Sequence, residues 1–341
     1  MEKILTIVIP TYNMQDYLRR CLDSLIVPEE QMKQLEVLVI NDGSKDNSSA
    51  IAHEYQDKYP DTFRVIDKEN GNYGSCVNRG LKEATGKYFR ILDADDWFDT
   101  VALCKFIGQL QHWDVDVIYT AFNTVELKGK SYRKSKITKQ SQFKTNVCID
   151  LTINALDDKF FAMHSLTYKL ELLNKIKFKQ EEKICYTDTE YVFYPLGHAK
   201  NLVCLDDVLY QYFVGREGQS MSLKRMSKNF SHFYKVLTNL LSYKFCISLP
   251  TQAKLCSYYF VVLLRYMLDI HLFMCIDNKK QDVVLHEVID TIIKRDVCFK
   301  DKINAINLKG CCYVTWWLSN SAINKVKLWL FIKLKRVTLK I

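Results

Sequence analysis

Short hydrophobic runs alternate with helical patterns at the start of the chain. Four apolar runs have the length and the β-branched or aromatic content of buried strands: 5–9, 36–40, 63–66 and 88–92. The segments between them carry apolar residues at helical spacing: 13–25, 46–55 and 75–83. Asn13 is expected to cap the first of these helices. Strands that alternate with helices predict an α/β fold with a mostly parallel central sheet and helices on both faces.

The pattern is less regular after Trp97. Four more elements are predicted: a strand at 115–119, an exposed connection or hairpin at 128–144, a strand or loop at 162–168 and a helix at 188–196. Beyond about Met226 the pattern is helical and aromatic. We therefore expect two domains, an α/β domain over 1–225 and a mainly helical C-terminal region over 226–341.

Polar, turn-forming residues follow three of the four predicted strands, at 10–13, 41–44 and 93–96. In an open α/β sheet, ligands bind outside the carboxyl ends of the strands. The third group places Asp93, Asp95 and Asp96 directly after a buried strand. Carboxylate oxygens suit the hard cations Mg2+ and Mn2+, which keep open positions that diphosphate oxygens can fill. The sequence therefore predicts a Mn2+ or Mg2+ site at this edge, facing a nucleotide-activated substrate.

Composition narrows the class of protein. The 341 residues are enough for a catalytic domain with an appendage. The twelve cysteines show no Cys-X-X-Cys spacing, and the first residues lack the pattern of a signal peptide. We therefore expect reduced thiols in a cytoplasmic protein. The net charge of +9 is modest for this length, and we expect no nucleic acid as a partner.

The last segment of the chain, 323–341, is basic and apolar. It carries lysines and an arginine but no acid, interleaved with leucine, tryptophan, phenylalanine and isoleucine. This composition suits a segment bound to an anionic membrane surface, on the inner face of the plasma membrane, and an ordinary basic terminal helix is the alternative. No apolar run approaches the roughly 20 residues of a transmembrane helix. The nearest, 258–274, is interrupted by charged residues and is expected to be a buried helix.

Three motifs in order resemble family 2 glycosyltransferases of the GT-A fold. They are TIVIPTYN at 6–13, VLVINDGSKD at 37–46 and LDADDW at 92–97, and the likeness covers about 4–222. The resemblance implies an inverting, metal-dependent enzyme that moves one sugar from a UDP-sugar to a saccharide acceptor. We expect a lipid-linked acceptor in cell-surface polysaccharide biosynthesis.

In that family, the first loop and the acid after the second strand hold the base and ribose of the nucleotide, usually uridine. Thr11 and Tyr12 would line the base, with Tyr12 stacked on it, and Asp42 would accept a hydrogen bond from uracil. The alternative for Asp42 is a turn aspartate before Gly43. The family usually has another acid where this chain has Asn41.

The segment 69–80 resembles the loop and helix beside the nucleotide in the same family. Asn70 and Asn78 are therefore expected to contact the nucleotide sugar. The position that usually holds arginine is Val77 here, and an arginine stands instead at Arg79.

The resemblance also implies a separate role for each acid of the motif at 92–97. Asp95 and Asp93 are the expected metal ligands, and Asp93 also contacts ribose or metal-bound water. Asp96 is expected to bind sugar or acceptor hydroxyls. Trp97 either stacks on a sugar face or belongs to the core.

An inverting transferase needs a base that deprotonates the acceptor hydroxyl. The stretch 186–191 resembles the family's acid pair at a helix start, which makes Asp188 the expected base and Glu190 the alternative. Thr187 replaces the first acid of the pair and is expected to cap the helix. Residues 215–222 resemble the segment that closes over the donor, so Arg216 either meets the diphosphate or lies in solvent.

Two other functions are weighed against this one. The departures at Thr187 and Val77 are compatible with a catalytically impaired nucleotide-sugar-binding or scaffolding subunit. A nucleotidyltransferase would carry a glycine-rich, basic loop after the first strand, and residues 10–13 lack it.

Overall fold

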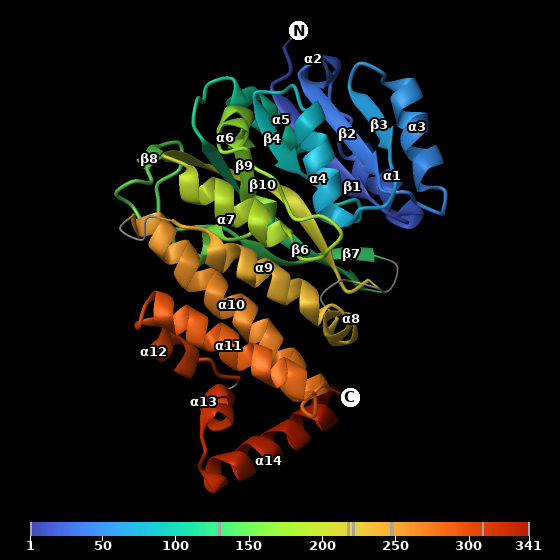
Figure 1. Cartoon of the computed structure of the whole chain (residues 1–341). Coiled ribbons are helices and arrows are strands. Elements are labelled where there is room, and N and C mark those ends of the chain that lie inside the picture. The colour runs from blue at the N-terminus through green and yellow to red at the C-terminus, as the bar shows by residue number, and fades with distance from the viewer. Residues whose placement is uncertain are drawn as a thin grey trace. The chain divides into compact units, whose positions relative to one another are not determined.

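The computed structural model describes residues 2–128, 131–216, 219, 222–245, 249–308 and 310–339. The chain divides into two compact units, Met1–Glu217 with Cys246–Lys254, and Gly218–Phe245 with Leu255–Ile341. The first unit contains the sheet, and the second is helical (Figure 1).

One mixed sheet organises the first unit, with the strand order β3-β2-β1-β4-β9-β6-β10-β5. Its parallel half consists of β1 (Leu5–Thr11), β2 (Leu35–Asn41), β3 (Phe63–Asp67) and β4 (Tyr88–Ile91). These strands coincide with the four predicted apolar runs. Their side chains are almost entirely buried in β1, β2 and β4, which explains why they are apolar on both faces.

The other half of the sheet is mixed. The long strand β6 (Val117–Lys128) runs parallel to β10 (Asn201–Val214) and antiparallel to β7 (Ser131–Thr138) and β9 (Leu166–Lys169). β6 and β7 confirm the hairpin among the two predicted alternatives; residues 129 and 130 lie outside the described ranges. Two short strands pair with β10, namely β5 (Trp97–Phe98) and β8 (Cys148–Asp150).

Helices cover both faces of the sheet. The α-helices of the first unit before β10 are α1 (Gln15–Asp23), α2 (Glu29–Met32), α3 (Ser48–Lys58), α4 (Asn72–Glu83), α5 (Thr100–Leu110), α6 (Leu170–Lys175) and α7 (Asp188–His198). Ile7 belongs to one core with buried residues of α1, α3 and α5. The next residue, Val8, faces α4, where a Cβ added to Gly80 would lie 2.5 Å from its side chain. The alternation of β1 side chains therefore separates the two helical layers.

The start of α1 differs from the prediction. Asn13 has a positive φ of 53° and its side chain accepts from the backbone N–H of Lys45, so it does not cap the helix. Asp46 supplies the cap from a distant loop, since its Oδ2 accepts from the N–H of Gln15 at 3.1 Å. Its Oδ1 accepts from the N–H of Ser48 at the start of α3. One carboxylate thus stabilises two helix N-termini that flank the first two loops.

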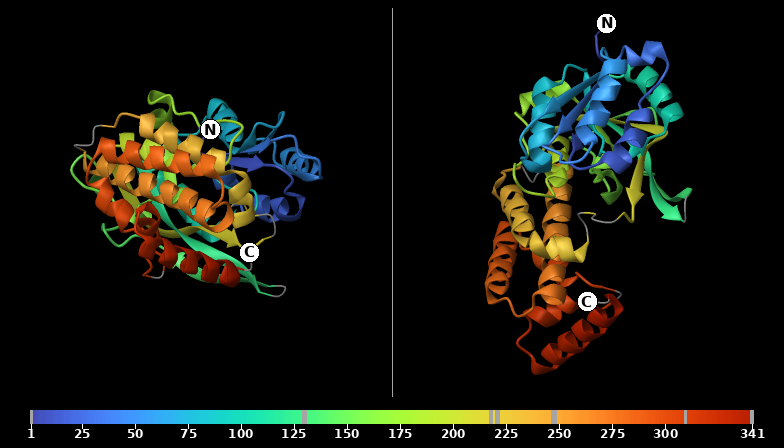
Figure 2. Two further views of the ribbon diagram at one scale, coloured as in Figure 1. Left: turned by 60° about the horizontal axis from the view of Figure 1, so that its bottom comes forward. Right: turned by 90° about the vertical axis from the view of Figure 1, so that its right-hand side faces the viewer.

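The second unit consists of the helices of the C-terminal part of the chain. Its elements are α8 (Leu223–Lys228), α9 (Phe230–Ser242), α10 (Pro250–Met274, which begins in the first unit), α11 (Lys279–Arg295), α12 (Phe299–Asn304), α13 (Tyr313–Leu318) and α14 (Ala322–Leu339). Within the described residues, α10 is the one helix long and apolar enough to cross a membrane, and 61% of its apolar window is buried. Leu264 and Met267 are fully buried, as expected of the core helix predicted there. Figure 2 shows these helices from two further sides.

Candidate active site

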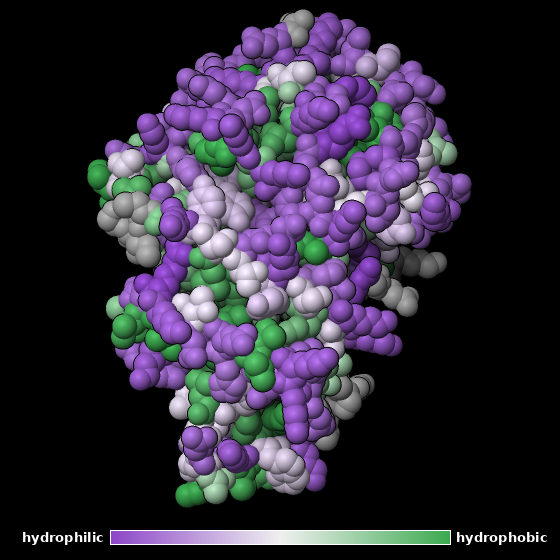
Figure 3. Space-filling view, viewed as in Figure 1, coloured by the Kyte–Doolittle hydropathy of each residue, from purple (hydrophilic) through white to green (hydrophobic). Residues whose placement is uncertain are grey.

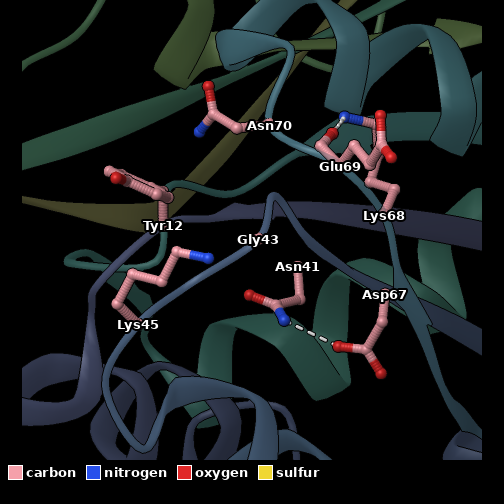
Figure 4. A pocket seen from close by; sticks show the side chains of 8 residues that line it. All are labelled: Tyr12, Asn41, Gly43, Lys45, Asp67, Lys68, Glu69 and Asn70. Atoms are coloured by element: carbon pink, nitrogen blue, oxygen red, sulfur yellow. Dashed lines mark hydrogen bonds between the residues drawn. The ribbon is translucent and has the colours of Figure 1, made fainter.

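A pocket lies at the carboxyl ends of β1, β2 and β3. Its volume is about 540 Å³, and its lining residues are Tyr12, Asn41, Gly43, Lys45, Asp67, Lys68, Glu69 and Asn70. Figure 4 shows Tyr12 and Lys45 on one side of it and Asn41 and Asp67 on the other. Tyr12 is 46% exposed and lines the pocket, so its side chain is accessible to a ligand there. Two residues predicted for the nucleotide, Tyr12 and Asn70, therefore line one cavity.

Asp42 lies directly beside this lining and is only 2% exposed. Its Oδ1 accepts from Lys68 Nζ at 2.5 Å and from the N–H of Gly71 at 2.9 Å. Asn70 Nδ2 donates to the backbone oxygen of Asp42 at 3.0 Å. The turn after it requires the left-handed conformation of Gly43, with φ +72°. Asp42 is thus a turn residue and a charged group at the pocket at once.

Thr11 and Asn78, unlike Tyr12 and Asn70, are not among the residues that line this pocket. Thr11 is buried at the end of β1, and its hydroxyl donates to the oxygen of Ile9. Asn78 Nδ2 donates to the oxygen of Gln180 and to Glu182, and its Oδ1 accepts from the N–H of Gln180. A donor contact by Asn78 stays a prediction, and it would require these bonds to be exchanged. Arg79 pairs with Glu83 on an exposed face of α4.

Two tyrosines hold the acidic motif through hydrogen bonds. Tyr73 of α4 donates its hydroxyl to Asp93 Oδ1 at 2.8 Å. Tyr210 of β10 donates its hydroxyl to Asp96 Oδ2 at 2.6 Å and accepts from the N–H of Asp93. The other oxygen of Asp96 accepts from the N–H of Phe213 at 2.7 Å. Asp96 therefore ties the motif to β10, and a sugar contact by it stays a prediction that would compete with these bonds.

Asp95 is paired with arginine. Arg216 Nε donates to Asp95 Oδ2, while Nη2 of Arg20 donates to the backbone oxygen of Asp95 at 2.7 Å. The remaining residues of the predicted closing segment at 217, 218, 220 and 221 lie outside the described ranges. The predicted metal ligand and the predicted diphosphate ligand thus contact each other, which excludes the alternative of a purely solvated Arg216.

Trp97 is half-buried in an aromatic cluster. The guanidinium carbon of Arg20 lies 3.9 Å from the Trp97 ring centroid and 4.3 Å from that of Tyr132. The two rings are 5.4 Å apart in an edge-on arrangement. Arg20 therefore covers part of the indole, and its hydrogen bond to the backbone oxygen of Asp95 connects this cluster to the acidic motif.

The structure groups one further residue with the acids. Asp93, Asp96 and His164 each offer a ligand atom, and these atoms lie within 4.8 Å of one another. Burial lowers the pKa of His164 to about 3, so the imidazole is neutral, which is the form that binds metals. Two carboxylates and an imidazole suit Mn2+, and the residues present therefore fit a divalent cation.

Burial and mutual repulsion act on the acids themselves. Burial, followed by the charge of Asp95, raises the pKa of Asp93 to about 7. Burial is also the largest cause of the raised pKa of Asp96, ahead of Asp95 and Asp93. The charge of Asp188 further raises the pKa of Asp93, so Asp188 belongs to the same electrostatic site. Groups that repel one another in this way are stabilised by a bound cation.

Asp188 stands at the first position of α7 with its side chain exposed. The surrounding protein reduces its hydration and raises its pKa, while the N–H of Thr189 lowers it. Thr187 precedes the helix without making a side-chain cap, contrary to the prediction. Glu190 is 1% exposed and accepts from the N–H of Glu181, so it lacks the access of Asp188.

Sequence reasoning overlooked Tyr73, His164 and Lys68. Tyr73 lies inside the recognised segment 69–80 but at a position that was given no role. Lys68 directly precedes that segment, and His164 lies in a part of the chain without any motif. His164 is half-buried and stands two positions before a strand, and a lone histidine at such a position gives no sequence signal for a ligand.

The mixed sheet, with a pocket and clustered acids at its carboxyl edge, defines an α/β domain with a candidate ligand site. Comparisons with known proteins agree. The model of glycosyl transferase family 2 matches residues 6–168. The uncharacterized glycosyltransferase MG060 homolog of Mycoplasma pneumoniae is 30% identical over 246 residues, which are 70% of this chain and 77% of that protein. The chain belongs to glycosyl transferase family 2 and is a glycosyltransferase.

Two further likenesses extend over more of the chain. The glycosyltransferase GlyG of Streptococcus pneumoniae is 27% identical over 314 residues, covering 89% of this chain and 96% of that protein. The structure of S. aureus TarS 1-349 in complex with UDP-GlcNAc has a TM-score of 0.60 at 19% identity, covering 85% of this chain and 81% of that one. The fold is therefore of the GT-A type, followed by a helical region.

Proposed function

We propose that this glycosyltransferase transfers one sugar from a UDP-sugar to a saccharide acceptor, with inversion at the anomeric carbon. The catalytic domain in this proposal is 1–225. The observation that carries it is the shared sheet edge: the pocket beside Asp42 lies at the carboxyl ends of β1, β2 and β3, and Asp93 and Asp95 follow β4, which pairs with β1. A uridine donor is also supported by the related fold of TarS, which was solved with UDP-GlcNAc.

The proposed reaction assigns one task to each group. The uracil ring stacks on Tyr12 and donates to Asp42, with Thr11, Asn70 and Asn78 on the nucleotide side. Asp188 accepts the proton of the acceptor hydroxyl while that oxygen attacks the anomeric carbon from the face opposite the diphosphate. The bond to the diphosphate breaks, and Arg216 meets the charge that develops on the leaving group.

A divalent cation, Mn2+ or Mg2+, fits the acids. Asp93 and Asp95 would hold it, as the family resemblance implies. The cluster of possible ligands in the structure contains Asp93 and His164 together with Asp96 in place of Asp95, so His164 and Asp96 are further candidate ligands. When bound, such an ion neutralises negative charge on a departing diphosphate. Asp96 keeps the motif attached to β10 through its hydrogen bond with Tyr210. Trp97, which packs against Arg20, would stack on a sugar.

The experiment that tests this function measures UDP release in the presence of Mn2+ and acceptor extracts, with a panel of UDP-sugars and matched GDP-sugars. We expect turnover with at least one UDP-sugar and transfer of its sugar to a saccharide. Binding of UDP-sugars without turnover under any acceptor would instead make the chain a nucleotide-sugar-binding subunit. Release of pyrophosphate would make it a nucleotidyltransferase.

We further propose that the acceptor is lipid-linked, in cell-surface polysaccharide biosynthesis, and that the cytoplasmic enzyme meets it at the inner face of the plasma membrane. The support lies in α14, where Leu328, Phe331 and Ile332 are buried and a second stripe is exposed. That stripe consists of Ile323, Val326, Leu330 and Leu334, which are 48–68% exposed and are spaced by three or four residues. Lysines flank it, and apolar residues reach the surface of this unit in Figure 3.

The membrane proposal makes its own prediction. Replacement of Val326, Leu330 and Leu334 by serine is expected to abolish sedimentation with vesicles that contain anionic lipid, because the exposed apolar stripe is lost while the buried side of α14 is kept. Replacement of the exposed Val283 on α11 by serine is the control and should leave sedimentation unchanged. Equal sedimentation of the triple variant and the wild type would refute membrane binding by α14.

A further inference from the structure

Arg90 is a fully buried arginine in β4, the strand that leads into the acidic motif. Its guanidinium group donates to three neutral oxygens. Nη1 donates to the hydroxyls of Thr167 at 2.7 Å and Thr120 at 3.2 Å, and Nη2 donates to the backbone oxygen of His164. Nε has no hydrogen-bond partner among the described residues. Because a guanidinium group keeps its proton in proteins, these three oxygens surround a full positive charge.

A charge at this position is costly for the fold. Arginine is rarely buried completely unless an acid pairs with it, because its hydration is lost on folding. Two rings complete its surroundings, with the guanidinium carbon 5.3 Å from the ring centroid of Phe98 and 5.8 Å from that of Phe106. Packing against such rings would favour an apolar side chain. The hydrogen bond to His164 offers a reason for the arginine.

The backbone oxygen that Arg90 holds belongs to a very short element, η2 (Met163–Ser165). Three residues are too few for the repeated backbone hydrogen bonds that make a longer helix rigid. The bond from Arg90 ties this turn to β4, and the two threonines extend the contact to β6 and β9. The position of η2 beside the acidic motif is therefore fixed by a contact with three strands of the sheet.

The imidazole of His164 is the part of η2 that reaches the acids. Its ring centroid lies 4.7 Å from that of Tyr210, whose hydroxyl donates to Asp96. A His164 nitrogen and one carboxylate oxygen from each of Asp93 and Asp96 lie within 4.8 Å of one another. Groups that bind a metal ion are themselves held in place by hydrogen bonds to residues around them. A shift of η2 would move the imidazole away from these two acids.

We propose that Arg90 is a positioning residue, which holds the backbone of η2 so that the His164 imidazole completes a divalent-cation site with the acids of the motif. This proposal rests on the use of a cation in the proposed function. A guanidinium group suits the task, because its planar set of donors reaches several oxygens at once and stays charged when buried. An ammonium group at the same place is a single point charge and would hold fewer of them.

The test measures Mn2+ binding by electron paramagnetic resonance of the free ion, with UDP present, for the wild type, Arg90→Met and Arg90→Lys. We expect Arg90→Met to weaken Mn2+ binding about tenfold or more, as is usual when a group that orients a metal ligand is lost. Arg90→Lys should lose less, since it keeps a charged donor. UDP binding in the presence of a chelator should be unchanged, because Arg90 does not line the nucleotide pocket.

Thr167→Val is the matched control. It removes one partner of the guanidinium group but leaves the bond to the His164 oxygen, so we expect a lower melting temperature and unchanged Mn2+ affinity. Adding His164→Ala to each Arg90 variant completes a double-mutant cycle, in which the substitution of Arg90 should cause no further loss of Mn2+ affinity. If Arg90→Met does not melt as a folded protein, Arg90→Lys carries the cycle.

Three results would overturn the role of Arg90. They are an unchanged Mn2+ affinity in a folded Arg90 variant, an equal loss in Thr167→Val, and a loss that keeps its full size in the His164→Ala background. Failure of the wild type to bind Mn2+ would overturn both this role and the cation of the proposed function. Turnover with a UDP-sugar would support the sugar transfer in each of these cases, so the two proposals are tested separately.

Discussion

Asp188→Asn is expected to lower kcat for sugar transfer by about a thousandfold or more. An amide cannot accept the proton of the acceptor hydroxyl, and a positioned base contributes on the order of 10²–10⁴ to such a rate. Donor affinity should change little, because Asp188 lies at the start of α7 and outside the nucleotide pocket. The measurement is steady-state UDP release together with UDP binding.

The pH dependence of kcat/KM is a second test of Asp188. A base works only when deprotonated, so kcat/KM should rise with pH through the pKa of Asp188. That pKa is raised by reduced hydration, which moves the acid limb above the pH at which an ordinary aspartate titrates. The residual rate of Asp188→Asn should lack this limb. Glu171→Gln, which changes an exposed acid on α6, should behave as the wild type. Retention of most activity by Asp188→Asn would remove Asp188 from the mechanism.

Asp95→Asn is expected to cause the second large loss, about a hundredfold or more in turnover, and to raise the Mn2+ concentration needed for activity. The reason is that charge on the leaving diphosphate loses its metal partner. Chelation of divalent ions should abolish wild-type transfer, and added Mn2+ or Mg2+ should restore it. Activity and UDP binding would be measured over a titration of Mn2+.

The Asp95→Asn variant also loses an ion pair with Arg216. The substitution also frees Arg216 from its ion pair, so a change in stability is expected alongside the loss of turnover. Thermal melting with and without Mn2+ separates the two effects, and Glu171→Gln again serves as the matched acid variant. If chelation leaves the wild-type rate unchanged, the metal proposal fails for this chain.

The sequence was sufficient to predict the strands of the parallel half of the sheet. β1, β2 and β4 are buried on both faces, so their composition alone distinguishes them from the surrounding chain. The loops that follow them carry Tyr12, Asp42 and Asp93 because turn residues are recognisable and the carboxyl ends of parallel strands share an edge. The short strand β5 was missed because Trp97–Phe98 is too short to show a period, and the helix α5 was also not predicted.

Contacts between distant segments were not predictable in the same way. Whether Asn13 or Asp46 caps α1 depends on how two loops meet, and local spacing favoured the wrong residue. The pairing of Arg216 with Asp95 joins positions 121 residues apart. His164 joins the acids because η2 (Met163–Ser165) places it near β10. A sequence pattern reports periodicity within an element but not such tertiary pairings.

Asn78 has a consequence for the design of chimaeric enzymes. Its amide holds Gln180, Gln180 in turn donates to the oxygen of Thr187, and Asp188 follows directly. Gly74 on the same helix permits this approach, since a Cβ there would lie 2.1 Å from the oxygen of Glu181. Helix α4 and the segment that carries the proposed general base therefore have matching surfaces. A crossover between relatives keeps this fit only if α4 and residues 178–198 come from the same parent.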